Sequence, residues 1–192
     1  MHIRLLVQAG AKMLKKRVLL LTGAPGIGKT TVLIKTMEAL KTQGVSVGGM
    51  ISREAKESGM RVGFEILDLT NGKHGWLAHV NQRVGPQVGK YRVNLHDLET
   101  IGAEAIMEAT KKCAVVAIDE IGPMELYSQK FKQAVKQALT SEKLVLAVVH
   151  AKARDQLIEE AKQREDAEIF SVTLATRDSL PIELAKQVVD TL

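Results

Sequence analysis

Hydrophobic residues along the chain follow two different spacings. Three short runs are continuously apolar, which is typical of strands buried on both faces of a sheet; they are residues 18–21, 113–118 and 144–149. Between them, apolar residues recur three and four positions apart, as in helices with one buried face; these segments cover residues 32–40, 95–112, 131–139, 155–162 and 181–191. With further strands expected at 45–51 and 168–173, the alternation predicts an α/β fold: a mainly parallel sheet with helices on both faces.

Residues 52–93 break this alternation. Apolar side chains occupy nearly every second position in residues 61–69, and the strand pattern resumes at residues 76–78. Between these segments, Asn71 and Gly72 form a dipeptide that is frequent in tight β-hairpin turns. We therefore expect an antiparallel excursion near residues 52–93, and this excursion carries more basic than acidic side chains.

The length and the charge distribution limit the classes of protein that the chain can represent. It has 192 residues, 45% of them hydrophobic, which suits one α/β domain and is short for two. The formal net charge of +5 comes entirely from five basic residues before position 18, namely Arg4, Lys12, Lys15, Lys16 and Arg17. Aromatic residues make up only 3% of the chain, too few for the stacking platforms of single-strand binders. We do not expect nucleic acid as a partner.

Cysteine content and hydropathy indicate the compartment. The single Cys113 excludes an intramolecular disulfide and suits a reducing environment. No run of about 18 apolar residues occurs, and residues 1–16 lack the apolar stretch of a secretory signal. We expect a cytoplasmic protein without a membrane partner, and we favour a monomer.

A glycine-rich motif follows the first predicted strand and precedes the first predicted helix. It fits the pattern G-x-x-x-x-G-K-[ST] at every fixed position and reads Gly23-Ala24-Pro25-Gly26-Ile27-Gly28-Lys29-Thr30. Glycines let the backbone N–H groups point inward at oxyanions, and the N-terminus of the helix adds partial positive charge. Lys29 then reaches the terminal phosphates, and the Thr30 hydroxyl is placed to bind Mg²⁺. The motif predicts a site for a nucleoside polyphosphate with magnesium.

Two adjacent acids end the buried run at residues 113–118. Asp119 lies at the carboxyl end of a parallel strand, the edge at which open α/β sheets bind ligands, and therefore suits a role on the magnesium ion. The next residue, Glu120, can orient and deprotonate a water molecule for attack on the γ-phosphorus. This pair predicts a hydrolytic site rather than a site that only binds nucleotide.

The same segment also fits the D-x-x-G element of switch GTPases, because Gly122 follows Asp119 by three positions. The Asn-Lys-x-Asp element that reads a guanine base does not occur in the chain. We therefore assign no guanine specificity.

Other polar residues are candidates to complete the site. His150 ends the third apolar run, where it could contact the γ-phosphate or the attacking water, and the alternative is a loop histidine bonded to backbone. Phosphoryl transfer often uses an arginine to neutralise charge. Arg53 is our first choice because it directly follows the second predicted strand; the other candidates are Arg61, Arg83, Arg92 and Arg177.

These residues resemble the THEP-type nucleoside triphosphatases, also called the cancer-related nucleoside-triphosphatase family. The resemblance begins near Met13 and extends to Leu192, and it rests on four segments: the glycine-rich motif with Thr31, residues 59–64, residues 118–126, and residues 173–181 with Arg177-Asp178. The sequence Met124-Glu125-Leu126 after the acidic pair is more specific than either nucleotide motif.

The resemblance implies a RecA-like core and magnesium-dependent hydrolysis of ATP, GTP, CTP and other nucleoside triphosphates to diphosphate and phosphate. It implies nucleotide-binding roles for residues 23–31, Asp119, Glu120 and Gly122, and we add Arg177 as a candidate. Residues 1–12 have no counterpart in the family, which makes them an N-terminal extension to a single domain at 13–192.

Two other functions stay open at this point. A small P-loop kinase would pass the γ-phosphate to a nucleotide or metabolite, with the excursion at 52–93 as its second pocket. A nucleotide-gated module would instead use slow hydrolysis to time its binding to a partner or to RNA. Glu120 beside Asp119 favours water as the acceptor.

Overall fold

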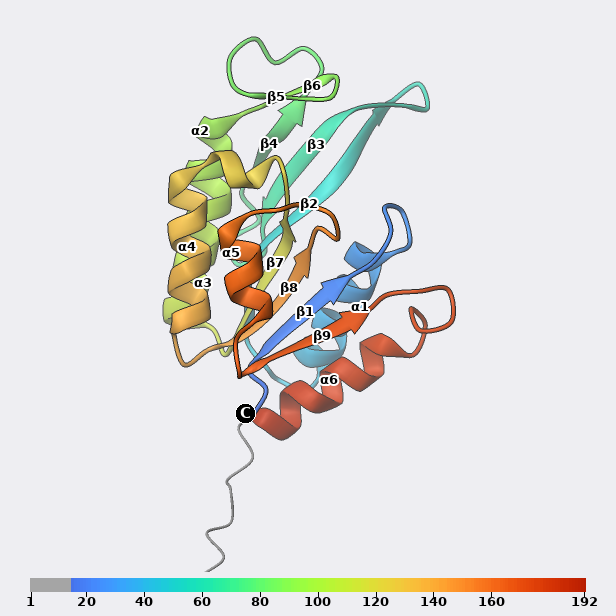
Figure 1. The fold of residues 1–192 in the computed structure, drawn as a ribbon, viewed down its shortest axis with the longest axis vertical. Helices are drawn as coiled ribbons and strands as arrows, with labels where there is room; N and C mark the ends of the chain where they lie inside the picture. The colour runs from blue at the N-terminus through green and yellow to red at the C-terminus, as the bar shows by residue number, and fades with distance from the viewer. Residues whose placement is uncertain (1–14) are drawn as a thin grey trace, which may run out of the picture.

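The computed structural model describes residues 15–192, and their strands form one nine-stranded sheet (Figure 1). The predicted extension at 1–12 and the domain start at 13 lie outside the described residues. In space the strand order is β5-β6-β4-β3-β2-β7-β8-β1-β9. The strands are β1 (Val18–Thr22), β2 (Val47–Glu57), β3 (Met60–Asp68), β4 (His74–His79), β5 (Gln87–Val88), β6 (Tyr91–Val93), β7 (Val115–Ile121), β8 (Leu144–Val149) and β9 (Ala167–Ser171).

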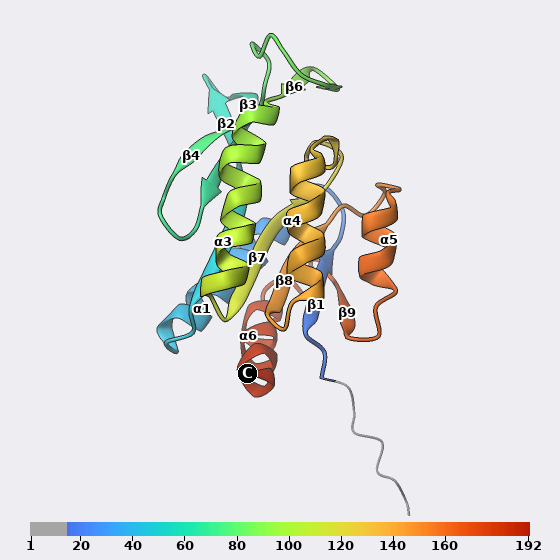
Figure 2. The same ribbon diagram turned by 90° about the vertical axis from the view of Figure 1, so that its left-hand side faces the viewer.

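Helices cover both faces of the parallel half, which consists of β2, β7, β8, β1 and β9. One face carries α1 (Lys29–Thr42) and α6 (Leu180–Thr191); the other carries α3 (Glu104–Lys112), α4 (Gln129–Thr140) and α5 (Gln156–Lys162) (Figures 1 and 2). Helix α3 continues from α2 (Leu95–Asp97) through a π-helical segment, η1 (Leu98–Ala103). This arrangement confirms the predicted fold class.

The first strand shows why its sequence is apolar at every position. Val18 and Leu20 belong to the core under α3, α4 and α5, whereas Leu19 and Leu21 belong to the core under α1 and α6. All four side chains are fully buried. Because both faces of the strand are covered, the burial of each side chain stabilises the fold, by about 1.5–3 kcal/mol.

Strand β2 joins the parallel half to the antiparallel half. The prediction that this strand ends at Ile51 is wrong, because β2 continues to Glu57. Its pairing with β7 stops at Met50, but the antiparallel strand β3 goes on supplying hydrogen-bond partners to the end of β2. Arg53 therefore lies within the strand, opposite Glu65, and not directly after it.

The predicted antiparallel excursion is confirmed and is part of the same sheet. Strands β3, β4, β6 and β5 pair antiparallel in that order (Figure 1). The turn at Asn71 and Gly72 joins β3 to β4, and Gly72 adopts a positive φ of 76°. The helix formed by α2, η1 and α3 covers one face of this half.

The two strands that carry the sequence motifs are not neighbours. Strand β8 lies between β1, which leads into the glycine-rich loop, and β7, which carries the acidic pair near its carboxyl end. This is the RecA-like order that the resemblance implies. Since the three strands are parallel, their carboxyl ends meet at one edge of the sheet, where ligands bind in folds of this kind.

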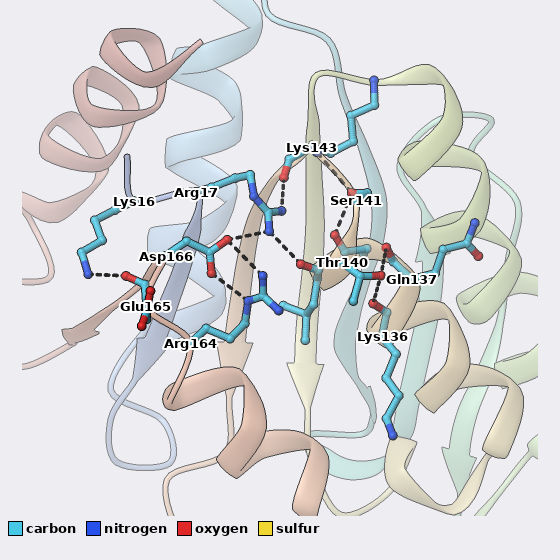
Figure 3. A network of polar contacts seen from close by, with 12 residues as sticks. Lys16, Arg17, Lys136, Gln137, Thr140, Ser141, Lys143, Arg164, Glu165 and Asp166 are labelled. Carbon is cyan, nitrogen blue, oxygen red and sulfur yellow. Dashed lines mark hydrogen bonds and ion pairs between the residues drawn. The ribbon is translucent and has the colours of Figure 1, made fainter. Parts of the chain in front are cut away.

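The opposite, amino edge is held by a charged cluster (Figure 3). Arg17 donates hydrogen bonds to the carbonyl oxygens of Lys143 and Leu139, each at 2.7 Å, and to Asp166 Oδ2 at 2.6 Å. Asp166 also accepts from Arg164 Nε at 2.8 Å. Burial opposes ionisation of Asp166, but the two guanidiniums outweigh it and hold its pKa below the usual range. Arg17, one of the five basic residues before position 18, thus ties the start of β1 to the segments before β8 and β9.

Candidate functional site

The glycine-rich loop connects the carboxyl end of β1 to the first turn of α1. Gly23 cannot carry a side chain, because a Cβ built there would lie 2.6 Å from the carbonyl oxygen of Val172. Gly28 caps α1 in the left-handed region, with φ 108° and ψ 22°, which other residues rarely adopt. The loop therefore needs glycine at two of its fixed positions for backbone reasons.

Lys29, the first residue of α1, lies over its own loop. Its Nζ donates to the carbonyl oxygens of Gly23 at 3.3 Å and Ala24 at 3.4 Å. The same atom is 3.8 Å from Glu120 Oε2. The side chain is only 10% exposed, so solvent and salt screen its attraction to the acidic pair only weakly.

Asp119 is brought to α1 although β8 separates their strands. Its residue is 1% exposed, and its Oδ2 accepts a hydrogen bond of 2.8 Å from the Thr30 hydroxyl. Burial raises the pKa of Asp119 to about 7, and the Glu120 carboxylate adds to this; the Thr30 hydroxyl and Lys29 act in the opposite direction. A buried carboxylate that is short of positive charge suits a cation.

The oxygen donors at this point fit magnesium. Thr30 supplies a hydroxyl and Asp119 a carboxylate, both hard ligands that Mg²⁺ prefers. In residues 15–192 no group of three or more His, Cys, Asp or Glu side chains is arranged to hold a metal by protein ligands alone. A bound Mg²⁺ would therefore take further oxygens from phosphate and water, as it does in most nucleotide sites.

Glu120 and Gly122 lie at the same edge, just beyond Asp119. The Glu120 side chain is 24% exposed, so water reaches it. A Cβ built on Gly122 would lie 2.9 Å from Glu120 Oε1 and 3.1 Å from Glu125 Oε2. The glycine thus leaves room for two carboxyl groups to approach each other.

Glu125 is the member of the site that motif reasoning missed. It lies in the short 3₁₀ helix η2 (Glu125–Tyr127), is 3% exposed and approaches the same point as Glu120. The signal in the sequence was an acidic residue between the apolar Met124 and Leu126. These three residues supported the family resemblance, but no role was assigned to the acid itself. An ionisable residue in an apolar segment that folds into the core indicates a specific role for its carboxyl group.

His150 directly follows β8, between the two motif strands. Its backbone N–H donates to Ile121 O at 3.1 Å, and its Nδ1 accepts from the N–H groups of Ala153 at 3.0 Å and Lys152 at 3.3 Å. This is the backbone-bonded arrangement named above as the alternative. Because Nδ1 is used, Nε2 is the ring atom left for a ligand.

The candidate arginines occupy different surroundings. Arg177 is exposed beside the glycine-rich loop, with its Cδ 4.0 Å from a Cβ built on Gly28. Arg61 pairs with Glu54 at 3.3 Å, and Arg92 donates to Gly85 O at 3.1 Å, so both are engaged within the antiparallel half. Arg83 lies in the segment between β4 and β5. The strand order adds Arg154, which sequence reasoning missed: it lies in the segment that leaves β8 between the two motif strands.

A glycine-rich loop between a parallel strand and a helix, with a strand-end carboxylate bonded to the second residue of that helix, defines a P-loop nucleotide-binding protein. A profile of the NTPase family matches residues 18–185. Nucleoside-triphosphatase THEP1 of Thermofilum pendens is 49% identical over 170 residues, which cover 88% of this chain and 93% of that protein. THEP1 of Methanosarcina acetivorans is 47% identical over 167 residues, covering 86% and 93%.

Solved structures agree. The crystal structure of THEP1 from the hyperthermophile Aquifex aeolicus has a TM-score of 0.75 and 29% identity, covering 87% of this chain and 96% of that chain. The solution structure of a human cancer-related nucleoside triphosphatase has a TM-score of 0.78 and 35% identity, covering 92% and 99%. The chain belongs to the NTPase family, and the resemblance to the THEP-type nucleoside triphosphatases is confirmed.

The structure bears on the predicted partners in one respect. None of the helices in residues 15–192 is long and apolar enough to cross a membrane. The expectations of a monomer and of no nucleic-acid partner stay predictions.

Proposed function

We propose that this protein is a magnesium-dependent nucleoside triphosphatase that hydrolyses ATP, GTP, CTP and other nucleoside triphosphates to diphosphate and phosphate. The observation that carries the proposal is the position of Glu120: partly exposed to water, next to the buried Asp119, and 3.8 Å from Lys29. We also expect the protein to act as a monomer in the cytoplasm.

The triphosphate tail binds to the glycine-rich loop. Backbone N–H groups of residues 23–31 and the N-terminus of α1 receive the phosphate oxygens. Lys29 leaves the carbonyl oxygens of Gly23 and Ala24, and the Glu120 carboxylate, for the β- and γ-phosphates, which carry more negative charge. The release of Glu120 by Lys29 couples nucleotide binding to the availability of the base.

Thr30 and Asp119 would hold a magnesium ion, which would supply positive charge to neutralise the phosphates. Asp119 is already hydrogen-bonded to Thr30, so the two oxygens need little rearrangement. Gly122 is the first residue after β7, two positions beyond Glu120, and its backbone N–H is a candidate contact to the γ-phosphate.

Glu120 acts as the general base. It accepts a proton from the attacking water while the water oxygen bonds to the γ-phosphorus. The bond from this phosphorus to the bridging oxygen breaks, and the electron pair leaves with the nucleoside diphosphate. His150 Nε2 and one arginine, Arg53 by our first choice with Arg154 and Arg177 as rivals, stabilise the charge on the transferred group.

Broad specificity follows from what these groups contact. The loop, Lys29, Thr30 and the acidic pair all address phosphates and the metal, which every nucleoside triphosphate shares. Arg177 lies exposed beside Gly28 and is the remaining candidate contact to the nucleotide.

The test is phosphate release from ATP, GTP, CTP and UTP, with Mg²⁺ and with EDTA in its place. We expect release from all four nucleotides and none with EDTA. Adding nucleoside monophosphates separates hydrolysis from a kinase reaction, because a kinase would form product only in the presence of an acceptor. Adding RNA tests the gated module, which requires a manyfold rise in rate.

A further inference from the structure

Glu125 has no part in the mechanism above, yet it lies beside the proposed base. Its carboxyl group accepts backbone hydrogen bonds from the N–H groups of Gly122 and of Glu125 itself. The backbone closes around it, with Leu126 N donating to Gly122 O at 3.1 Å and Ser128 N donating to Glu125 O at 3.1 Å. The side chain is thus enclosed by the turn that follows β7.

The two oxygens of Glu120 have different neighbours. Oε1 approaches the Cβ position of Gly122 at 2.9 Å, and Glu125 Oε2 approaches the same point at 3.1 Å. Oε2 of Glu120 is instead the oxygen that approaches Lys29, at 3.8 Å from its Nζ. One oxygen therefore faces Glu125 and the other faces the glycine-rich loop.

We propose that Glu125 is a positioning residue for Glu120: it fixes Oε1 beside Gly122, so that Oε2 is the oxygen presented to the attacking water. This inference rests on the proposed function, in which Glu120 is the base. Glu125 itself is 3% exposed, and in this proposal it acts only through Glu120.

The protonation state of Glu125 fits this role. Burial raises the pKa of Glu125 to about 8, and the carboxylates of Glu120 and Asp119 add to the effect against the two backbone N–H groups. At pH 7 the carboxyl group is therefore mostly protonated, so it does not repel the Glu120 carboxylate as a second negative charge would, and it carries an O–H donor.

Two substitutions separate positioning from mere filling of space. Glu125→Gln keeps the size and an N–H donor, and we expect its kcat to stay within about threefold of wild type. Glu125→Met keeps a similar volume without a donor, and we expect kcat to fall about 100-fold, the cost of misplacing a reacting group by about 1 Å. KM should stay within about twofold in both, because the glycine-rich loop is unchanged.

A double-mutant cycle tests whether Glu125 acts through Glu120. In the Glu120→Gln background, Glu125→Met should lower kcat no further, since the group that it positions is absent. If the two losses multiply, or if Glu125→Gln is as slow as Glu125→Met, the positioning role is wrong. Wild-type protein that releases no phosphate would instead overturn the proposed function itself.

Gly122→Ala is the deciding variant if Glu125→Met melts at a much lower temperature than wild type. Its added methyl group would push between the two carboxyl groups while Glu125 stays in place. We expect a fall in kcat of at least about tenfold with KM unchanged; a fully active Gly122→Ala protein would contradict the proposal. Glu99→Gln is the matched control, because Glu99 accepts a hydrogen bond of 2.9 Å from Ser128 nearby but lies outside the carboxyl group pair.

Discussion

At the amino edge of the parallel strands two guanidiniums, from Arg17 and Arg164, share the single carboxylate of Asp166. At the carboxyl edge the balance is reversed: in the described residues Lys29 is the one cation paired with the group formed by Asp119, Glu120 and Glu125. The first cluster also satisfies backbone carbonyl groups and is complete without a ligand. In the second cluster burial raises the pKa of Asp119 and of Glu125, so a bound cation would stabilise the charged forms of carboxyl groups that the fold itself disfavours.

The residues at the amino edge therefore stabilise the sheet, whereas those at the carboxyl edge are suited to binding a ligand. Variants at the carboxyl edge should lose turnover more than stability, and variants at the amino edge should do the opposite.

The largest effect is expected for Lys29→Ala. Removing the cation that binds the terminal phosphates should lower kcat/KM by at least about 10³-fold, since both nucleotide binding and charge neutralisation are lost. Phosphate release and isothermal titration with a nonhydrolysable nucleotide measure the two parts. Unchanged turnover would remove the glycine-rich loop from the mechanism.

Glu120→Gln should retain nucleotide but lower kcat about 10³-fold, because the base is lost while the phosphate contacts remain. Single-turnover kinetics with a measured dissociation constant check this. Rapid hydrolysis by this variant would show that another group is the base.

Arg17→Met should have the opposite effect to Lys29→Ala: it should lower stability and leave turnover unchanged. Loss of hydrogen bonds to two carbonyl groups and to Asp166 is expected to lower the free energy of unfolding by about 2–3 kcal/mol, with kcat unchanged. Urea denaturation and phosphate release measure the two quantities. As a control, Glu108→Gln removes surface ion pairs with Lys111 and Lys112 and should leave the melting temperature unchanged.

Arg53→Ala tests whether the site at the carboxyl edge extends as far as β2. If the exposed Arg53 on β2 completes the site, kcat should fall about tenfold with nucleotide affinity nearly unchanged. The control is Lys56→Ala on the same strand. An unchanged rate would exclude Arg53 and leave Arg154 and Arg177 to be compared in the same assay.

The smallest effect concerns pH. Because the folded pKa of Glu125, about 8, lies above its ordinary value of 4.5, the unfolded chain releases this proton at a lower pH than the folded protein does. The contribution of Glu125 to stability is therefore complete below about pH 4.5 and is lost as the pH rises toward 8. The melting temperature of the nucleotide-free protein should fall by several degrees between pH 5 and 8. In Glu125→Gln that fall should be smaller, and equal slopes would contradict the raised pKa.

Much of the fold could be predicted because local patterns agreed with tertiary packing. The apolar positions Val32, Leu33, Met37 and Leu40 are all buried in α1, and the run at 144–149 is β8. Asn94 caps α2, with its side chain accepting from Asp97 N. The pair has the spacing of a capping box, but Asp97 makes no return bond to Asn94 N, because its Oδ2 accepts from Trp76 N of β4 instead. Such a competing partner, far away in sequence, is invisible to a local pattern.

The sequence by itself determined the alternation of strands and helices, the glycine-rich loop and the identity of the acidic pair, because these depend on residue types at short spacings. Only the tertiary structure decided that β8 separates the two motif strands while Thr30 still bonds to Asp119. It likewise decided that β2 extends beyond its pairing with β7, so that Arg53 lies within the strand. It also decided that Glu125 is buried against Glu120. These features depend on contacts between residues distant along the chain, and no local spacing encodes the distance or the dielectric environment that such contacts create.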